Sequence, residues 1–391
     1  MLTSKKISAR SQRVSSFHVM DVMSRAKALE EKGKTIVHME VGEPDFPTAQ
    51  PILDAGKEFL EGGKVHYTTA QGLPALRKKI VQFYKVEYKV DISADQVFIT
   101  PGASGALTVA LALLLDEGRE VLMADPGYPC NSNLTALFSA VANNIPVSAE
   151  QSFQLTATDV LQAWSDKTQG VMIASPSNPT GTLMNAEQMK ALLEVINDKS
   201  GFLISDEIYH GLVYEDRAVS ALEFSDDVFV LNSFSKFYGM TGWRLGWLIV
   251  PKYAIDAANR LIQNLYIAAP TQSQYAALVA FDKGTKKILM ERKEEFKARR
   301  DYLFNGLKEL GFILSEKPQG AFYIYADCSS FSDDSYAFSL ALLNEAGVAV
   351  TPGIDFGGNN SKRYLRFAYT TSIEQIELGL ARIRTFLKTR V

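Results

Sequence analysis

Residues 232–247 read NSFSKFYGMTGWRLGW and directly follow an apolar run at 228–231. A lysine at the end of a buried strand is costly to desolvate unless the protein uses its amine. The aromatic residues Phe234, Phe237, Tyr238 and Trp243 make the surroundings of Lys236 apolar, so we expect its pKa to be lowered. Such an amine is suited to forming a Schiff base with a carbonyl compound. The stretch therefore predicts a reactive lysine.

Around this stretch, short apolar runs alternate with helix-length segments. The runs cover residues 97–100, 120–124, 171–175, 201–205, 228–232 and 245–250. Continuous apolar runs separated in this way are typical of a mostly parallel sheet covered by helices on both faces. We therefore predict an α/β fold whose large domain has a mostly parallel, seven-stranded-type sheet. Polar residues follow each run, and in such sheets the ligand crevice lies at the carboxyl ends of the strands.

The pattern changes after about residue 285. A charged segment at 286–300 has apolar residues at helical spacing, which indicates a long amphipathic helix. Residues 320–328, 347–353 and 364–369 read as strands of a smaller α+β domain. We predict three parts: an N-terminal arm with part of the small domain (1–46), a large cofactor-binding domain (47–285) and a small C-terminal domain (286–391).

Composition narrows the class of protein. The chain has 391 residues, of which 47% are hydrophobic, and a net charge of −3, so a nucleic-acid surface or a membrane tether is not indicated. Its apolar stretches fall short of a membrane span. Two cysteines and four scattered histidines favour a reduced, cytoplasmic protein with no metal site. The basic, serine-rich residues 1–17 are compatible with a transit peptide or with an arm on a partner subunit.

A phosphate anchor is indicated close to the reactive lysine. Arg244 lies between Gly242 and Gly246, and glycines on both sides suggest a close backbone approach, while guanidinium suits phosphate. A Gly-rich turn opens an apolar helix near residue 102, which would place the amides of Ala103 and Ser104 at its positive end. A carbonyl partner and a phosphate anchor together indicate pyridoxal 5'-phosphate.

That cofactor makes further demands on the sequence. A carboxylate should face the pyridine nitrogen, and Asp206 ends a predicted strand, with Glu207 as the alternative. Tyr209 is close enough in sequence to donate to the phenolic oxygen of the ring. Tyr128 is available to stack on the ring, and Asn178 lies in a proline-rich turn that suits directional hydrogen bonding.

The chain resembles the class I/II pyridoxal-phosphate aminotransferases, a fold type I family, most specifically over residues 233–246. The resemblance implies that Lys236 forms the Schiff base with the cofactor and then moves the α-proton. It also implies that Asp206 pairs with the ring nitrogen, while Tyr209 and Asn178 contact the ring oxygen. The residues expected at the phosphate are Ser233 and Arg244, with Ser235 as a secondary candidate.

Three further segments match the family. Gly42, in VGEPDFPT (41–48), matches the glycine whose backbone meets the substrate carboxylate. Tyr67 matches the tyrosine that reaches the phosphate of the neighbouring subunit's cofactor, which implies a homodimer with shared active sites. Arg366, in the middle of an apolar strand, matches the arginine that clamps the α-carboxylate. A buried arginine without an anionic partner is costly, so a structural ion pair is the alternative.

These features predict a transaminase that moves an amino group from an L-amino acid to a 2-oxo acid by a ping-pong mechanism. The aromatic surroundings weakly favour large neutral or aromatic substrates over aspartate. The residues that we expect near the side-chain pocket are Phe17, His18, Met20, Tyr67, Tyr128 and Phe322. The alternative activity is a carbon–sulfur β-lyase; an aminocyclopropane-carboxylate synthase is more distant, and a DNA-binding regulator would need a longer N-terminal extension.

Overall fold

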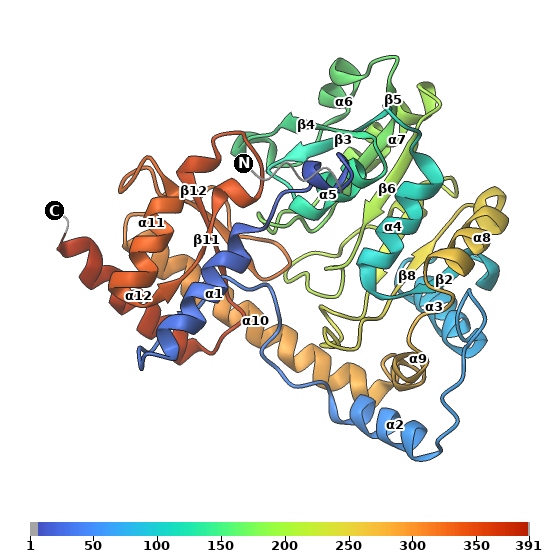
Figure 1. The fold of residues 1–391 in the computed structure, drawn as a ribbon, viewed down its shortest axis with the longest axis horizontal. Coiled ribbons are helices and arrows are strands. Elements are labelled where there is room, and N and C mark those ends of the chain that lie inside the picture. The colour runs from blue at the N-terminus through green and yellow to red at the C-terminus, as the bar shows by residue number, and fades with distance from the viewer. Residues whose placement is uncertain (1–6, 390–391) are drawn as a thin grey trace.

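The computed structural model describes residues 7–389, and a seven-stranded sheet forms its centre (Figure 1). In spatial order the strands are β2 (Val97–Thr100), β8 (Gly246–Ile249), β7 (Phe229–Ser233), β6 (Phe202–Asp206), β5 (Thr168–Ala174), β3 (Glu120–Asp125) and β4 (Val141–Pro146). β8 runs antiparallel to both of its neighbours, and the remaining pairs are parallel. The predicted α/β fold is confirmed.

Twelve α-helices surround the sheets within the described residues. They are α1 (His18–Glu30), α2 (Gln50–Glu61), α3 (Pro74–Glu87), α4 (Gly102–Leu114), α5 (Pro129–Leu137), α6 (Ala157–Ala163), α7 (Ala186–Asp198), α8 (Ile255–Leu265), α9 (Thr271–Ala277), α10 (Lys283–Glu309), α11 (Ser335–Ala341) and α12 (Ile373–Lys388). No helix among them is long and apolar enough to cross a membrane.

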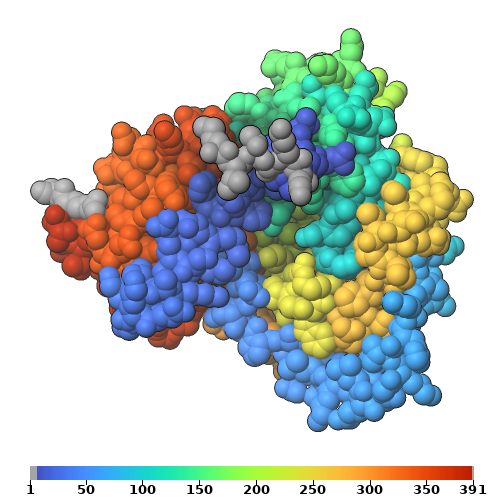
Figure 2. Space-filling view, viewed as in Figure 1, coloured from blue at the N-terminus to red at the C-terminus, as the bar shows by residue number. Residues whose placement is uncertain are grey.

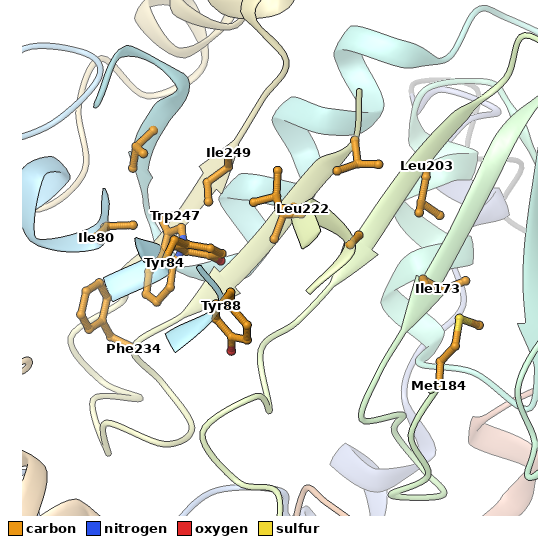
Figure 3. Close-up of a cluster of buried hydrophobic side chains, with 14 of the residues drawn as sticks. Ile80, Tyr84, Tyr88, Ile173, Met184, Leu203, Leu222, Phe234, Trp247 and Ile249 are labelled. Atoms are coloured by element: carbon orange, nitrogen blue, oxygen red, sulfur yellow. The ribbon is translucent and has the colours of Figure 1, made fainter. Parts of the chain in front are cut away.

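Successive strand residues point to opposite faces of the sheet, and both faces are buried. In β6, Leu203 belongs to the same buried cluster as apolar residues of α3 and α7, while Ile204 belongs to the cluster that contains residues of α4 and α8. In β8, Trp247 joins the first of these cores beside Tyr84 and Phe234 (Figure 3). The apolar runs of the sequence are continuous because each strand needs apolar residues on both sides.

β4 is the one strand of the central sheet that we did not predict. Its sequence, VANNIP, has no apolar run, since it lies at the edge of the sheet and is only partly buried. Edge strands do not need two apolar faces, and a pattern based on continuous hydrophobicity misses them.

A second, smaller group of strands lies in the C-terminal part of the chain. β11 (Thr351–Pro352), β12 (Tyr364–Ala368) and β9 (Tyr323–Asp327) form an antiparallel sheet, and β1 (Val37–His38) pairs with β10 (Val348–Ala349). The N-terminal segment thus lies beside the C-terminal part of the chain (Figures 1 and 2). The division into parts at about residues 46 and 285 stays a prediction.

α10 is the long amphipathic helix expected near 286–300, and it extends over 27 residues. It contacts α2 near one end and β9 and α12 farther along, so it runs along both groups of elements (Figure 1). At the N-terminus, the backbone N–H of Ser15 donates to Asn133 Oδ1 (3.1 Å). Residues 1–6 lie outside the described part of the chain, so the interpretation of 1–17 as a transit peptide or an arm stays open.

Candidate active site

Three adjacent parallel strands bring the predicted residues to one edge of the sheet. β5, β6 and β7 lie side by side, with Ala174 paired to Asp206 and Asp206 paired to Leu231. The loops after these strands carry Asn178, Tyr209 and Lys236. Parallel register therefore places residues from three distant segments at the carboxyl ends of the strands, where ligands bind in open α/β sheets.

The Lys236 amine lies in an enclosed, partly aromatic environment. Its Nζ donates a hydrogen bond to the carbonyl oxygen of Gly42 (2.7 Å) and lies 5.8 Å and 5.5 Å from the ring centroids of Tyr209 and Phe322. Burial, together with the positive charges of Arg366 and Arg244, lowers the pKa of Lys236 to about 8. The expected direction of the pKa change is confirmed, although the rings nearest to Nζ come from other segments than the lysine's own.

Asp206 is a buried carboxylic acid that lacks a cationic hydrogen-bond partner among residues 7–389. Its Oδ1 accepts a hydrogen bond from the N–H of Ile208 (3.2 Å). Burial raises the pKa of Asp206 to about 7. An acid in this situation is stabilised as the carboxylate by a nearby positive charge, such as a protonated pyridine nitrogen.

Glu207, the alternative partner, points to a different set of groups. Its carboxylate accepts hydrogen bonds from the Ser220 hydroxyl (2.9 Å), the Ala221 N–H (2.9 Å) and the Ser205 hydroxyl (3.2 Å). Because these bonds engage the carboxylate within the protein, Asp206 is the better partner for a cofactor.

Close backbone contacts bring Arg244 to the start of α4. A Cβ built on Gly246 would lie 2.9 Å from the amide nitrogen of Ala103 and 2.7 Å from the carbonyl oxygen of Asn232. A Cβ on Gly102 would lie 2.6 Å from Nη2 of Arg244. The arginine therefore lies at the amino end of a 13-residue helix, a favourable place for a phosphate.

The two glycines on either side of Arg244 have different surroundings in the described structure. Gly246 is required by a close approach of protein backbone, as the distances above show. Gly242 has no other protein atom within 4 Å of its Cβ position in the described structure, so a close approach of its backbone to a bound ligand stays a prediction. Since Gly242 is exposed, it leaves room beside Arg244.

The three serines that we expected near the phosphate lie in different surroundings. Ser233 is buried, and its hydroxyl donates to the Leu245 carbonyl (3.3 Å) and accepts from the Ser235 N–H (3.0 Å). Ser235 is buried directly beside it, whereas Ser104 is exposed in the first turn of α4. Ser233 and Ser235 lie at and just after the end of β7, and Ser104 lies at the start of α4. Gly246 is in close contact with both of these segments.

Arg366 is buried without an acidic partner. Its Nη1 donates to Asn178 Oδ1 (2.9 Å), and its Nη2 donates to the Glu40 carbonyl (2.5 Å) and to the Thr351 hydroxyl (3.2 Å). No acidic side chain of residues 7–389 lies within ion-pair distance of it, and the buried Nε has no hydrogen-bond partner there. The structural ion pair that we considered as the alternative is therefore absent from the described structure, and the guanidinium suits an anionic ligand.

Sequence reasoning missed Tyr323. Its hydroxyl is 2.9 Å from the hydroxyl of Tyr209, and its ring centroid is 4.3 Å from the Arg366 guanidinium. A Cβ built on Gly42 would lie 1.9 Å from the Tyr323 hydroxyl. Tyr323 lies in the segment 320–328, which we predicted only as a strand; its place diagonal to Arg366 is set by the register of the antiparallel pair, which no local pattern encodes.

A cavity of about 210 Å³ adjoins this cluster and shares Tyr128 and Asn178 with it. None of its lining residues, all within the described part of the chain, is Lys, Arg or His. Of the other residues that we expected near a side-chain pocket, Met20 is 50% exposed on α1, and Tyr67 is 81% exposed. The Phe17 ring stacks on Tyr128 with centroids 6.3 Å apart.

The residues present fit pyridoxal phosphate. A lysine amine with a lowered pKa, a buried acid without a cation, and an arginine at a helix amino end supply the three contacts that its carbonyl, ring nitrogen and phosphate need. A second arginine, buried without an anion, lies within reach of the same crevice. The fold and this cluster are those of an enzyme of the pyridoxal-phosphate type.

Comparisons with known proteins agree with this class. The family model of aminotransferase class I and II matches residues 34–383. The chain is 42% identical to the (5-formylfuran-3-yl)methyl phosphate transaminase of Methanocaldococcus jannaschii, over 97% of this chain and 99% of the other. It is 36% identical to the valine–pyruvate aminotransferase of Mycobacterium tuberculosis, over 96% and 97% of the two chains.

A solved structure shows the same fold. A protein from Methanococcus jannaschii, with an active site similar to that of kynurenine aminotransferases, superposes with a TM-score of 0.90 at 41% identity, covering 97% of this chain and 100% of that one. The chain belongs to the class I and II aminotransferase family. It is a pyridoxal-phosphate-dependent transaminase, and the resemblance first seen at residues 233–246 is confirmed.

Proposed function

We propose that the protein transfers an amino group from a large neutral or aromatic L-amino acid to a 2-oxo acid, with Lys236 as the catalytic amine. The observation that carries this proposal is Arg366, a buried guanidinium without an anionic partner, in a crevice that also holds a lysine with a pKa of about 8. The two groups match the α-carboxylate and the α-proton of an amino acid. Two substrates that use one site in turn predict ping-pong kinetics.

Each residue has a distinct task in this proposal. When bound, pyridoxal phosphate supplies an electron sink that stabilises the charge left by removal of the α-proton. Arg366 binds and orients the substrate carboxylate through two donors. Lys236, whose amine is partly neutral near pH 7–8, takes the α-proton and returns it.

Other side chains hold the cofactor in the same proposal. The Asp206 carboxylate keeps a proton on the ring nitrogen, and the Tyr209 hydroxyl and the Asn178 amide contact the ring oxygen. The phosphate is held by Arg244 and by the residues at the start of α4 and the end of β7: Ala103, Ser104, Ser233 and Ser235. The Tyr128 ring stacks on the cofactor, and the Gly42 backbone meets the substrate carboxylate.

The preference for neutral substrates rests on the adjoining cavity. A second carboxylate, as in aspartate, needs a second cation, and the residues that line this cavity include no Lys, Arg or His. Aromatic side chains such as Tyr128 and Phe356 line it instead.

We further propose a cytoplasmic homodimer with shared sites. Tyr67 is 81% exposed, which suits a side chain that reaches a partner's cofactor phosphate. Both cysteines, Cys130 and Cys328, are free, as expected in a reducing compartment. Heterodimers of a Tyr67→Phe chain and a Lys236→Ala chain test the sharing, because only shared sites place both defects in one site and leave the other intact.

The function is tested by visible spectroscopy of the cofactor-loaded protein with single amino acids and no oxo acid. We expect neutral or aromatic amino acids to convert the absorption band stoichiometrically, with one oxo acid released per site. Release of ammonia and pyruvate over many turnovers would instead establish the β-lyase alternative, which the comparisons do not favour. Conversion by aspartate alone would contradict the proposed substrate class.

A further inference from the structure

Tyr323 connects three parts of the active site that come from distant segments. It lies in β9, and its side chain is fully buried between the loop after β6, the segment that contains Gly42, and β12. Its hydroxyl is 2.9 Å from the Tyr209 hydroxyl, and its ring covers the Arg366 guanidinium at 4.3 Å. One side chain therefore contacts both a residue proposed to bind the cofactor and the residue proposed to bind the carboxylate.

The hydroxyls of Tyr209 and Tyr323 can each donate only one hydrogen bond. Each tyrosine has one O–H, so in a hydrogen-bonded pair one hydroxyl donates and the other accepts. If Tyr209 donates to the phenolic oxygen of the cofactor, its own oxygen can only accept from Tyr323. The direction of the Tyr323 hydrogen bond thus fixes the direction of the Tyr209 hydrogen bond. Hydrogen bonds in such a chain also polarise and strengthen one another.

The ring of Tyr323 acts on Arg366 in a second way. A guanidinium over the face of a tyrosine ring is held by the ring quadrupole, and the effect is larger when the pair is desolvated. Phe356 lies on the same guanidinium, with its ring centroid 4.9 Å away. The three hydrogen bonds of Arg366 and these two rings together hold the guanidinium in one orientation.

We infer that Tyr323 is a positioning residue of the active site: its hydroxyl directs the proton of Tyr209 toward the cofactor, and its ring orients Arg366 for the substrate carboxylate. The inference rests on the proposed function, because it assigns the cofactor contact to Tyr209 and the carboxylate contact to Arg366. Tyr323 itself contacts neither reacting atom in this account.

The hydroxyl is tested by pH titration of the visible band of the cofactor-loaded protein. A hydroxyl that donates to the phenolic oxygen stabilises negative charge there, so its removal raises the midpoint of the titration. We expect Tyr209→Phe to raise the midpoint by about 1–2 pH units. Tyr323→Phe should raise it by about 0.2–0.5 pH units, since one bond in a chain strengthens the next by about 10–30%.

The double variant shows whether Tyr323 acts through Tyr209. We expect Tyr209→Phe/Tyr323→Phe to have the same midpoint as Tyr209→Phe alone, because the path to the cofactor is already removed. The matched control is Tyr325→Phe, two residues along the same strand; the buried Tyr325 hydroxyl has no hydrogen-bond partner among residues 7–389. The midpoint of this control should equal that of the wild type.

The role of the Tyr323 ring is tested by measuring the affinity for a carboxylate without an amine. The ligand is 3-phenylpropionate or propionate, depending on which of the two binds the wild type more tightly. Calorimetry on the loaded protein should show affinity within about twofold of the wild type for Tyr323→Phe, which keeps the ring. Tyr323→Leu should lose about three- to thirtyfold in affinity. Tyr323→Met replaces it if the leucine variant does not fold.

The outcomes separate the inference from the proposed function. If Tyr209→Phe moves the midpoint while Tyr323→Phe does not, or if the two shifts add in the double variant, the hydroxyl part of the inference is wrong. If the variants without a ring bind the carboxylate like the wild type, the part about Arg366 is wrong. If Tyr209→Phe itself leaves the midpoint unchanged, the proposed role of Tyr209 fails, and the inference fails with it.

Discussion

Replacing Arg366 by lysine tests the proposed carboxylate site most directly. The guanidinium makes three hydrogen bonds, to Asn178, Glu40 and Thr351, which leaves its Nε–H and one Nη1–H as donors for a ligand. A lysine keeps the charge but offers the substrate one donor in place of two. Loss of one charge-assisted hydrogen bond costs about 1.5–3 kcal/mol, which corresponds to about a 10- to 150-fold decrease in kcat/KM.

The assay is stopped-flow conversion of the cofactor band with phenylalanine and with 2-phenylethylamine, which lacks the carboxylate. We expect Arg366→Lys to slow the reaction of the amino acid and to leave that of the amine within about twofold, because the amine makes no contact with Arg366. Arg363→Lys is the matched control: Arg363 lies at the start of the same strand region and pairs with Asp327 (2.7 Å), half exposed. A folded, cofactor-loaded Arg366→Lys protein with less than a threefold loss for phenylalanine would refute the reasoning.

Three other predictions follow from local contacts. In the cofactor-free protein, labelling of Lys236 by acetic anhydride, read by mass spectrometry, should have a midpoint near pH 8 because burial lowers its pKa to about 8; a midpoint near the ordinary lysine value would contradict this. The hydrogen bond to Glu40 raises the pKa of His38 to about 9, so its stabilisation is complete below pH 6.5 and is lost as the pH rises through 9. After discounting for its 38% exposed side chain, His38→Gln should lower the free energy of unfolding by about 1–2 kcal/mol at pH 6 and by almost nothing at pH 10 in urea titrations, and an equal loss at both pH values would argue against the ion pair. Gly246→Ala should lower the free energy of unfolding by about 1–3 kcal/mol, since the new Cβ meets three backbone atoms at 2.7–2.9 Å. Gly284→Ala is the control, because the Cβ position of Gly284 lies in open space and its substitution should not lower the stability. Equal stability of the two variants would show that the backbone relaxes around the new Cβ of residue 246.

Sequence reasoning recovered the parts of the fold that have a strong local signal. All six apolar runs are strands of the central sheet, because both faces of these strands are covered and most of their residues face an apolar core. The antiparallel direction of β8 was not predicted, since strand direction depends on the chain's path between elements. β4 was missed because its half-exposed residues do not form an apolar run.

The residues of the candidate site also divide into those with a local sequence signal and those without one. Lys236, Asp206 and Arg366 could be found because each is a charged residue next to or within an apolar run, which is unfavourable without a use. Tyr323 could not be found in this way, since tyrosine is common in strands and its role depends on contacts with Tyr209 and Arg366. The hydrogen bond from Lys236 to the Gly42 carbonyl joins residues that are 194 positions apart in the sequence, so no local pattern encodes it.

The half-exposed strand β4 also limits how copies of this protein can associate. An open sheet edge is a template for β-augmentation by another chain, and polar residues and proline weaken it. β4 carries Asn143 and Asn144 and ends with Pro146, which has no N–H to offer an incoming strand. At the opposite edge, the Ile99 N–H of β2 already donates to the Gln71 carbonyl (2.9 Å). Growth of the sheet from one molecule to the next is thus disfavoured at both edges.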